Sequence, residues 1–209
     1  IALYAYKNPY LHSFCLNFYV KAGVLYEEEN ENGITHFWEH IEFRNLNRFH
    51  RNELYALLAM HGLSMNAATY KEFVQIRISG APDRFRTAAD IFTKILEPLC
   101  VTKADVDVER KKIKREIIEG QTTENLLDGF AAQTVWEETS LTKTITGTPA
   151  SLDRINLKKL KLFKQETLSA NNLFFYLTGC FDDDDTEYFR KKVSEYALPV
   201  SAKRENCPA

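Results

Sequence analysis

Two histidines and a glutamate stand within five residues of one another, in a pattern that could hold and use a metal ion. His36, Glu39 and His40 form the sequence H-F-W-E-H inside a stretch with helical periodicity. Residues four apart lie on one face of a helix, so both imidazoles can reach one ion, and Glu39 projects from the same side. Neutral imidazole is a good zinc ligand, but a catalytic zinc needs a third protein ligand and an open position for water. The pattern therefore indicates a zinc site whose third ligand lies elsewhere in the chain.

Residues 103–119 supply two candidate carboxylates on one predicted helix face. Glu109 and Glu116 are nearly two turns apart and fall on the same stripe as Val106 and Ile113. An ionised carboxylate left unpaired in the interior costs several kcal/mol, so two of them on the core side require a cation or hydrogen-bond donors. A divalent metal would be that cation.

Ordinary packing is the simpler interpretation of the same residues. His36 and His40 could be hydrogen-bonded within the core, and Glu39 could be a surface carboxylate. The pattern H-x-x-E-H arises in about one in a hundred shuffled chains of this composition, as short motifs do. The two downstream glutamates make a chance origin of the whole set rarer.

The elements that would hold these residues in place show both strand and helix periodicity. Strand alternation of apolar and polar residues covers residues 2–7, 13–21, 64–70, 73–79 and 172–180. Apolar residues at helical spacing cover residues 33–44, 52–60, 85–99, 103–119, 124–138, 152–168 and 186–196. The order predicts an α+β fold in two layers, with a mixed, mostly antiparallel β-sheet and helices packed on one face. No repeat or linker interrupts it, so we expect residues 1–209 to form a single domain.

Composition excludes several other classes of protein. The chain is 44% hydrophobic and 27% charged, which is typical of a folded domain, and its 27 basic and 29 acidic residues give no electrostatic reason to expect nucleic acid or an anionic membrane as partner. No apolar stretch approaches the ~20 residues that span a bilayer.

The four cysteines lie far apart, which favours buried thiols in a reducing compartment, and we expect a cytoplasmic location. Because residue 1 is Ile, a targeting segment could lie upstream. The acidic runs 27–29 and 182–185 are interpreted as solvated turns.

Residues 33–43, G-I-T-H-F-W-E-H-I-E-F, resemble the active-site segment of the pitrilysin and insulinase family of inverzincin peptidases. In that family a third metal ligand follows about seventy-six residues after the second histidine, and this spacing falls on Glu116. The supporting glutamate of the family, seven residues earlier, corresponds to Glu109. The match at the motif is the strongest part of the resemblance.

The resemblance continues along most of the chain. Residues 65–69, M-N-A-A-T, resemble the N-A-x-T strand that binds the substrate backbone in that family. Residues 147–163 and 169–181 resemble later landmarks in the same order. Substrate-binding roles are therefore implied for the matching residues of the strand, which are Asn66, Ala67, Ala68 and Thr69.

The resemblance implies a zinc endopeptidase that hydrolyses short or unfolded polypeptides. His36, His40 and Glu116 would hold one zinc ion. Glu39 would act as the general base that takes the proton of the attacking water. Glu109 would orient the site without binding the metal.

Departures from the family pattern leave alternatives open. The family often continues after Phe43 with Gly-Thr, whereas this chain has Arg44 and Asn45. Family peptidases usually pair this domain with a similar metal-free one, so we expect a second homologous domain or subunit, or self-association. The alternative function is that of a non-catalytic or partner subunit. A further alternative resembles the lyase that cleaves S-ribosylhomocysteine, which uses a cysteine as third ligand, and Cys100 is the nearest candidate.

Overall fold

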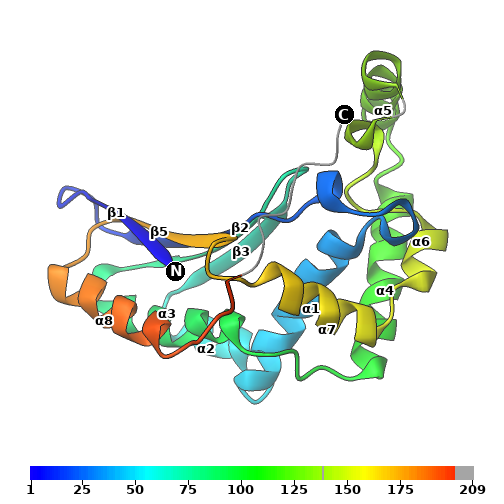
Figure 1. The fold of residues 1–209 in the computed structure, drawn as a ribbon. Helices are drawn as coiled ribbons and strands as arrows, with labels where there is room; N and C mark the ends of the chain where they lie inside the picture. The colour runs from blue at the N-terminus through cyan, green and yellow to red at the C-terminus, as the bar shows by residue number, and fades with distance from the viewer. Residues whose placement is uncertain (138, 201–209) are drawn as a thin grey trace.

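The structure is a computed structural model and describes residues 1–137 and 139–200. Within these residues, a single five-stranded sheet runs in the order β1-β5-β2-β4-β3 (Figure 1). The strands are β1 (Ala2–Lys7), β2 (Phe14–Val20), β3 (Ser64–Thr69), β4 (Val74–Gly80) and β5 (Leu173–Gly179). β1 pairs with β5 in parallel, and the other neighbouring pairs are antiparallel. The mixed, mostly antiparallel sheet predicted from the sequence is confirmed.

Helices cover one face of this sheet, as Figure 1 shows with the sheet above and most of the helices below it. The α-helices of the described residues are α1 (Ile34–Phe49), α2 (Leu54–Met60), α3 (Phe85–Phe92), α4 (Lys103–Glu119), α5 (Thr123–Trp136), α6 (Pro149–Arg154), α7 (Leu157–Thr167) and α8 (Asp183–Ser194). Short 3-10 segments lie at η1 (Val24–Tyr26), η2 (Glu29–Glu31), η3 (Pro82–Arg84), η4 (Thr93–Leu96) and η5 (Ser140–Thr142). The α+β class is confirmed.

The helix boundaries differ from the prediction at several places. α1 continues to Phe49 instead of ending near residue 44, and the helix predicted over residues 85–99 is α3 followed by the 3-10 segment η4. The helix predicted over residues 152–168 is divided into α6 and α7. The division arises because Ile155 is extended and the Asn156 side chain caps a new helix by accepting the backbone N–H of Lys159 in its first turn. The acidic run 182–185 is no solvated turn: it caps α8 and forms its first turn, where negative charge is favourable.

Alternate residues of the central strands form the core between the sheet and the helices. Leu16 of β2 lies between Ile78 of β4 and Leu177 of β5, and all three side chains are fully buried. Phe18 and Phe175 form the next layer, with ring centroids 5.4 Å apart. Burying side chains of this size is worth about 1.5–3 kcal/mol each. This packing holds the sheet, and with it the edge strand β3, in a fixed position beside α1.

Helix α5 stands apart from the two layers (Figure 1). None of its residues is buried, although Leu126, Leu127, Phe130 and Trp136 are large and apolar. The last turn of α4 also has an apolar side chain in contact with solvent, because Ile118 is 68% exposed. An apolar surface therefore faces solvent on this arm of the described chain.

Two expectations drawn from composition concern membrane-spanning segments and the state of the cysteines. None of the helices in residues 1–137 and 139–200 combines the length and the apolar character that crossing a membrane requires. Cys15, Cys100 and Cys180 carry free thiols, and Cys207 lies outside the described residues. The expectation of buried thiols is wrong for all three: Cys15 and Cys180 are half-buried, and Cys100 is exposed on the connector before α4.

Candidate metal centre

The N-terminus of α1 is held by a buried carboxylate that the sequence analysis assigned to a solvated turn. The Glu27 side chain accepts hydrogen bonds from the backbone N–H groups of Gly33, at 2.7 Å, and Thr35, at 2.9 Å. These donors have no partner within the helix, and a negative charge there is favoured by the helix dipole. Glu27 therefore fixes the turn that carries His36.

Glycine is required where α1 begins. Gly33 has φ 93°, in the left-handed region, and its backbone lies against Gly147. A Cβ atom on Gly147 would come 2.4 Å from the carbonyl oxygen of Asn32. The close contact joins the segment before α1 to the loop before α6.

His36, His40 and Glu116 bring their ligand atoms together at one point. The Nε2 atom of His36 is 3.6 Å from Glu116 Oε1, and the Nε2 atom of His40 is 3.5 Å from Glu116 Oε2. One donor atom from each of the three residues lies within 4.8 Å of the other two, the only such group among the described residues. Four ligands at about 2.0–2.2 Å from a tetrahedral zinc lie about 3.4 Å from one another. The three side chains therefore fit a zinc ion in both spacing and chemistry.

Both histidines can present a lone pair to such an ion. Burial, with a smaller contribution from the neighbouring His40, lowers the pKa of His36 to about 4, so His36 is neutral at pH 7. The Nδ1 atom of His40 is 3.4 Å from Glu109 Oε2. A neutral His40 that donates from Nδ1 keeps the lone pair on Nε2, the atom that faces Glu116.

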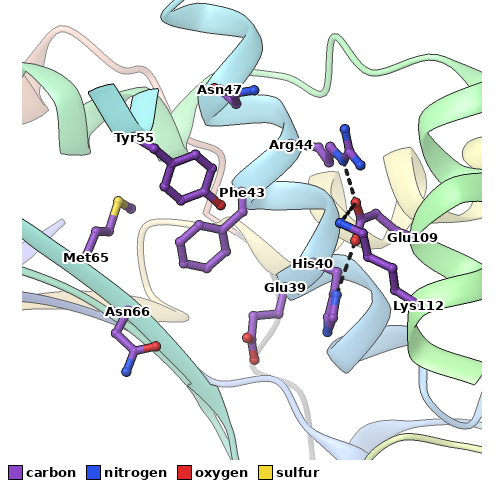
Figure 2. Close-up of a pocket in the computed structure, with 10 residues that line it drawn as sticks. All are labelled: Glu39, His40, Phe43, Arg44, Asn47, Tyr55, Met65, Asn66, Glu109 and Lys112. Atoms are coloured by element: carbon purple, nitrogen blue, oxygen red, sulfur yellow. Dashed lines mark hydrogen bonds and ion pairs between the residues drawn. The ribbon is translucent and has the colours of Figure 1, made fainter. Parts of the chain in front are cut away.

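Glu109 is a buried carboxylate surrounded by donors (Figure 2). Arg44 donates to it through Nε, and Lys112 Nζ lies 3.0 Å from the same oxygen, Oε1. Burial raises the pKa of Glu109, but the hydrogen bonds from His40, Arg44 and Lys112 outweigh it and lower the pKa to about 2. Glu109 is therefore ionised, and it touches a candidate ligand without belonging to the ligand group. Sequence reasoning noted Arg44 only as a departure and missed Lys112.

Glu39 extends from α1 toward β3, and in Figure 2 it points into the same region as His40. Its Oε2 atom accepts a hydrogen bond from the hydroxyl group of Thr69. Burial raises the pKa of Glu39, and the charge of Glu116 adds to the rise, whereas the Thr69 hydrogen bond and His40 oppose it. A carboxylate with a raised pKa is suited to taking up and releasing a proton.

Glu116 shares the α1-facing side of α4 with Glu109, as predicted, but the prediction that it is buried there is wrong. Glu109 is buried, but the Glu116 side chain is 49% exposed. The last fully buried residue of α4 is Ile113, and among the residues that follow it in this helix only Ile117 packs partly against the core. Solvent therefore reaches the candidate metal position from the side of Glu116.

Cys100 belongs to no group of possible metal ligands among residues 1–137 and 139–200. The alternative with a cysteine as third ligand is therefore not supported by the positions of the described residues.

Strand β3 forms a free edge of the sheet next to this position. The Tyr70 N–H donates to the Phe73 carbonyl and closes the hairpin to β4. Since bonded and non-bonded pairs alternate in an antiparallel ladder, Ala67 and Thr69 turn their backbone N–H and C=O groups away from β4. The Ala67 N–H is instead accepted by the Asn66 side chain at 2.9 Å. Of the four residues predicted to bind substrate, Ala67 and Thr69 thus have backbone groups at the open edge.

A pocket of about 550 Å³ lies beside Glu39 and His40 (Figure 2). Phe43, Tyr55 and Met65 give it an apolar wall from α1, α2 and β3. The remaining lining residues are Arg44, Asn47, Asn66, Glu109 and Lys112. The pocket is large enough for a side chain of a bound peptide.

The lowered pKa of Glu109 leads to a prediction about stability in the absence of metal. Because its pKa in the folded chain, about 2, lies below the unfolded value of about 4.5, Glu109 stabilises the fold fully above pH 4.5 and loses that effect as the pH falls toward 2. Glu109→Gln is expected to lower the free energy of unfolding by about 3 kcal/mol at pH 7 and by much less near pH 3. Denaturant titrations from pH 7 to pH 3 measure the difference. Glu119→Gln, an exposed change on the same helix, is the control. A difference that stays constant with pH would contradict the assignment.

Comparison with known sequences places this chain among peptidases. The sequence model described as Insulinase (Peptidase family M16) matches residues 4–149. The beta subunit of the mitochondrial-processing peptidase of Mus musculus is 27% identical over 157 residues, which cover 75% of this chain and 32% of that protein. An uncharacterized zinc protease of Rickettsia bellii (strain RML369-C) is 23% identical over 186 residues, which cover 88% of this chain and 45% of that protein. The chain thus spans from about a third to under half of the length of these relatives.

Comparison of folds gives a similar result. The crystal structure of the periplasmic protease PqqL from Escherichia coli matches with a TM-score of 0.85 at 22% identity. The match covers 98% of this chain and 24% of that chain. The described fold is therefore one that a larger protease contains.

Proposed function

The chain belongs to the insulinase family of peptidases, peptidase family M16, and we propose that it is a zinc-dependent endopeptidase acting on short or unfolded polypeptides. In this proposal His36, His40 and Glu116 hold one zinc ion, Glu39 is the general base, and Glu109 orients His40. The observation that carries it is the convergence of two Nε2 atoms and one carboxylate at 3.5–3.6 Å, with a second carboxylate beside them. Sequence similarity alone would not distinguish this function from that of a partner subunit.

Each residue of the proposed site has a separate role in peptide hydrolysis. Zinc, when bound, would polarise the scissile carbonyl and lower the pKa of a water molecule. Glu39 takes the proton of the attacking water on its carboxylate and delivers it to the nitrogen of the leaving amine. Glu109 holds the His40 ring by accepting from Nδ1, and the cations Arg44 and Lys112 keep Glu109 ionised.

The open edge of β3 supports an extended peptide as substrate. A polypeptide that adds to this edge gains main-chain hydrogen bonds from Ala67 and Thr69, and such bonds do not depend on its sequence. Folded proteins present few free strands, so we expect little attack on them. Asn66 and Ala68, which alternate with these residues, keep their backbone bonds to β4.

Ala67→Pro tests the edge directly, because it removes an N–H that β4 does not use. We expect KM for an unstructured peptide to rise about tenfold, the value of one lost hydrogen bond, while the melting temperature stays close to that of the wild type. Ala68→Pro is the matched control: it removes a ladder bond and should lower the melting temperature. Unchanged KM in a folded Ala67→Pro chain would count against peptide addition at β3.

A second homologous domain, on the same chain or a partner, is part of the proposal. The relatives are about twice as long as this chain or slightly more, and the arm formed by α5 exposes apolar side chains of the kind that interfaces cover. Such a domain would shield the solvent-exposed side of Glu116 and exclude water from the site.

Peptide hydrolysis by the zinc-loaded chain, with and without a homologous domain, tests the function. The probe is an unstructured peptide with a fluorophore and quencher at its ends, and zinc content is measured on the same samples. Hydrolysis that requires zinc supports the proposal. Zinc-loaded protein that cleaves no peptide in either condition would instead favour the non-catalytic or partner subunit.

A further inference from the structure

We propose that the hydroxyl group of Thr69 is a positioning group for Glu39, and that it ties the general base to the strand that receives the peptide. The inference rests on the proposed function, because it assigns a role within the same site. It adds a role for the side chain to the sequence-based expectation, which gave Thr69 a part in binding substrate.

The contact between Thr69 and Glu39 joins two elements that are far apart in sequence. Thr69 is the last residue of β3, and its side chain lies on the helix-facing side of the sheet, the side on which Met65 and Ala67 also pack. From there its hydroxyl donates to Glu39 Oε2 on α1. Among the described residues, no other hydrogen bond to the Glu39 carboxylate is formed, so Oε1 keeps its lone pairs.

Thr69 is a rigid donor. A β-branched side chain on a strand is restricted at χ1, so the hydroxyl has few alternative positions. The backbone that follows Thr69 is also held, because the Tyr70 N–H donates to the Phe73 carbonyl and the Lys71 carbonyl accepts from the Leu25 N–H. Glu39, in contrast, has three rotatable side-chain bonds and needs an external contact to keep one orientation.

The same residue faces the substrate with its backbone. Thr69 holds a non-bonded position opposite Val74, so its N–H and C=O point to the open edge. Thr69 would then hold both the bound peptide, through its backbone, and the Glu39 carboxylate, through its hydroxyl group. An error of about 1 Å in such an arrangement can cost about 10²-fold in rate, so one hydrogen bond can affect turnover without affecting binding.

The test compares Thr69→Val, which removes the hydroxyl at constant shape, with Thr69→Ser, which keeps it. For Thr69→Val we expect kcat to fall about tenfold to a hundredfold, KM to change by less than about threefold, and zinc content to stay at the wild-type level. Thr69→Ser should recover most of kcat. Thr178→Val, the same exchange on β5 away from the site, is the control and should leave every parameter unchanged.

A second readout does not depend on activity. Crystal structures of the zinc-loaded wild type, Thr69→Val and Thr69→Ser show where the Glu39 carboxylate lies. We expect one position in the wild type and in Thr69→Ser, and a displaced or divided position in Thr69→Val. If the wild type cleaves no peptide, the proposed function fails, and these structures still decide whether Thr69 positions Glu39.

Three results would overturn the inference. The first is a wild-type kcat in Thr69→Val. The second is a rise in KM with unchanged kcat, which would mean that the hydroxyl binds substrate. The third is an unmoved Glu39 carboxylate in the Thr69→Val structure.

Discussion

Glu39→Gln is expected to abolish peptide hydrolysis while one zinc ion per chain stays bound. Glutamine has the shape of glutamate and can still accept the Thr69 hydrogen bond, but it cannot take a proton from water. Both imidazoles and Glu116 remain in place, so the metal keeps its three protein ligands. The loss of a general base costs about 10²–10⁴-fold in rate. Single-turnover hydrolysis and elemental analysis of the same preparation measure the two effects separately.

The matched control for this variant is Glu53→Gln, a carboxylate next to α2 that is exposed and outside the pocket lining. It should keep both zinc and turnover. Full turnover in Glu39→Gln would show that the base lies elsewhere. Loss of zinc in Glu39→Gln would mean instead that Glu39 helps to hold the metal.

His36→Ala, His40→Ala and Glu116→Gln are each expected to remove most of the bound zinc. Each change deletes one of three converging donors, and two ligands cannot complete a catalytic zinc site. The loss in affinity should exceed the roughly 10–100-fold that removal of a supporting residue costs, so Glu109→Gln should retain more zinc than any of the three. Competition with a chelator of known affinity ranks all four variants.

Glu119→Gln, one turn beyond Glu116 on α4, controls for the change of charge on that helix and should bind zinc like the wild type. Zinc is added back after any purification that uses a chelator, since metal loss can be an artefact of handling. Full zinc content in all three ligand variants would refute the assignment of His36, His40 and Glu116.

The parts of the site that could be predicted from sequence are those set by local periodicity. His36 and His40 converge because residues four apart share a helix face, and that holds wherever the helix is placed. The strands β2, β4 and β5 were recognisable because each has one buried face, which produces alternation. The helical stripe of α4 likewise identified the face that carries Glu109 and Glu116.

The parts that could not be predicted depend on contacts between distant segments. Glu27 stands in a run of three glutamates that is typical of a solvated turn, and only the folded chain brings it beneath the first turn of α1. A signal was present, since acidic residues shortly before a helix are favoured there. The exposure of Glu116 was unpredictable for a related reason. Periodicity identifies which face of a helix is directed toward the core, but it does not show how far along the helix other elements cover that face.

The order of strands in the sheet has a consequence for how this chain folds during synthesis. β5 comes last in the sequence, yet it lies between β1 and β2 and pairs with both. Until β5 has been translated, β1 has no partner strand among the described residues, and the edge of β2 that pairs with β5 stays unpaired. Non-local pairing of this kind is slow, and exposed strand edges favour aggregation. The five-stranded sheet can therefore close only after β5 has been translated, and we expect a nascent chain that stops before β5 to expose unpaired strand edges of the kind that chaperones bind.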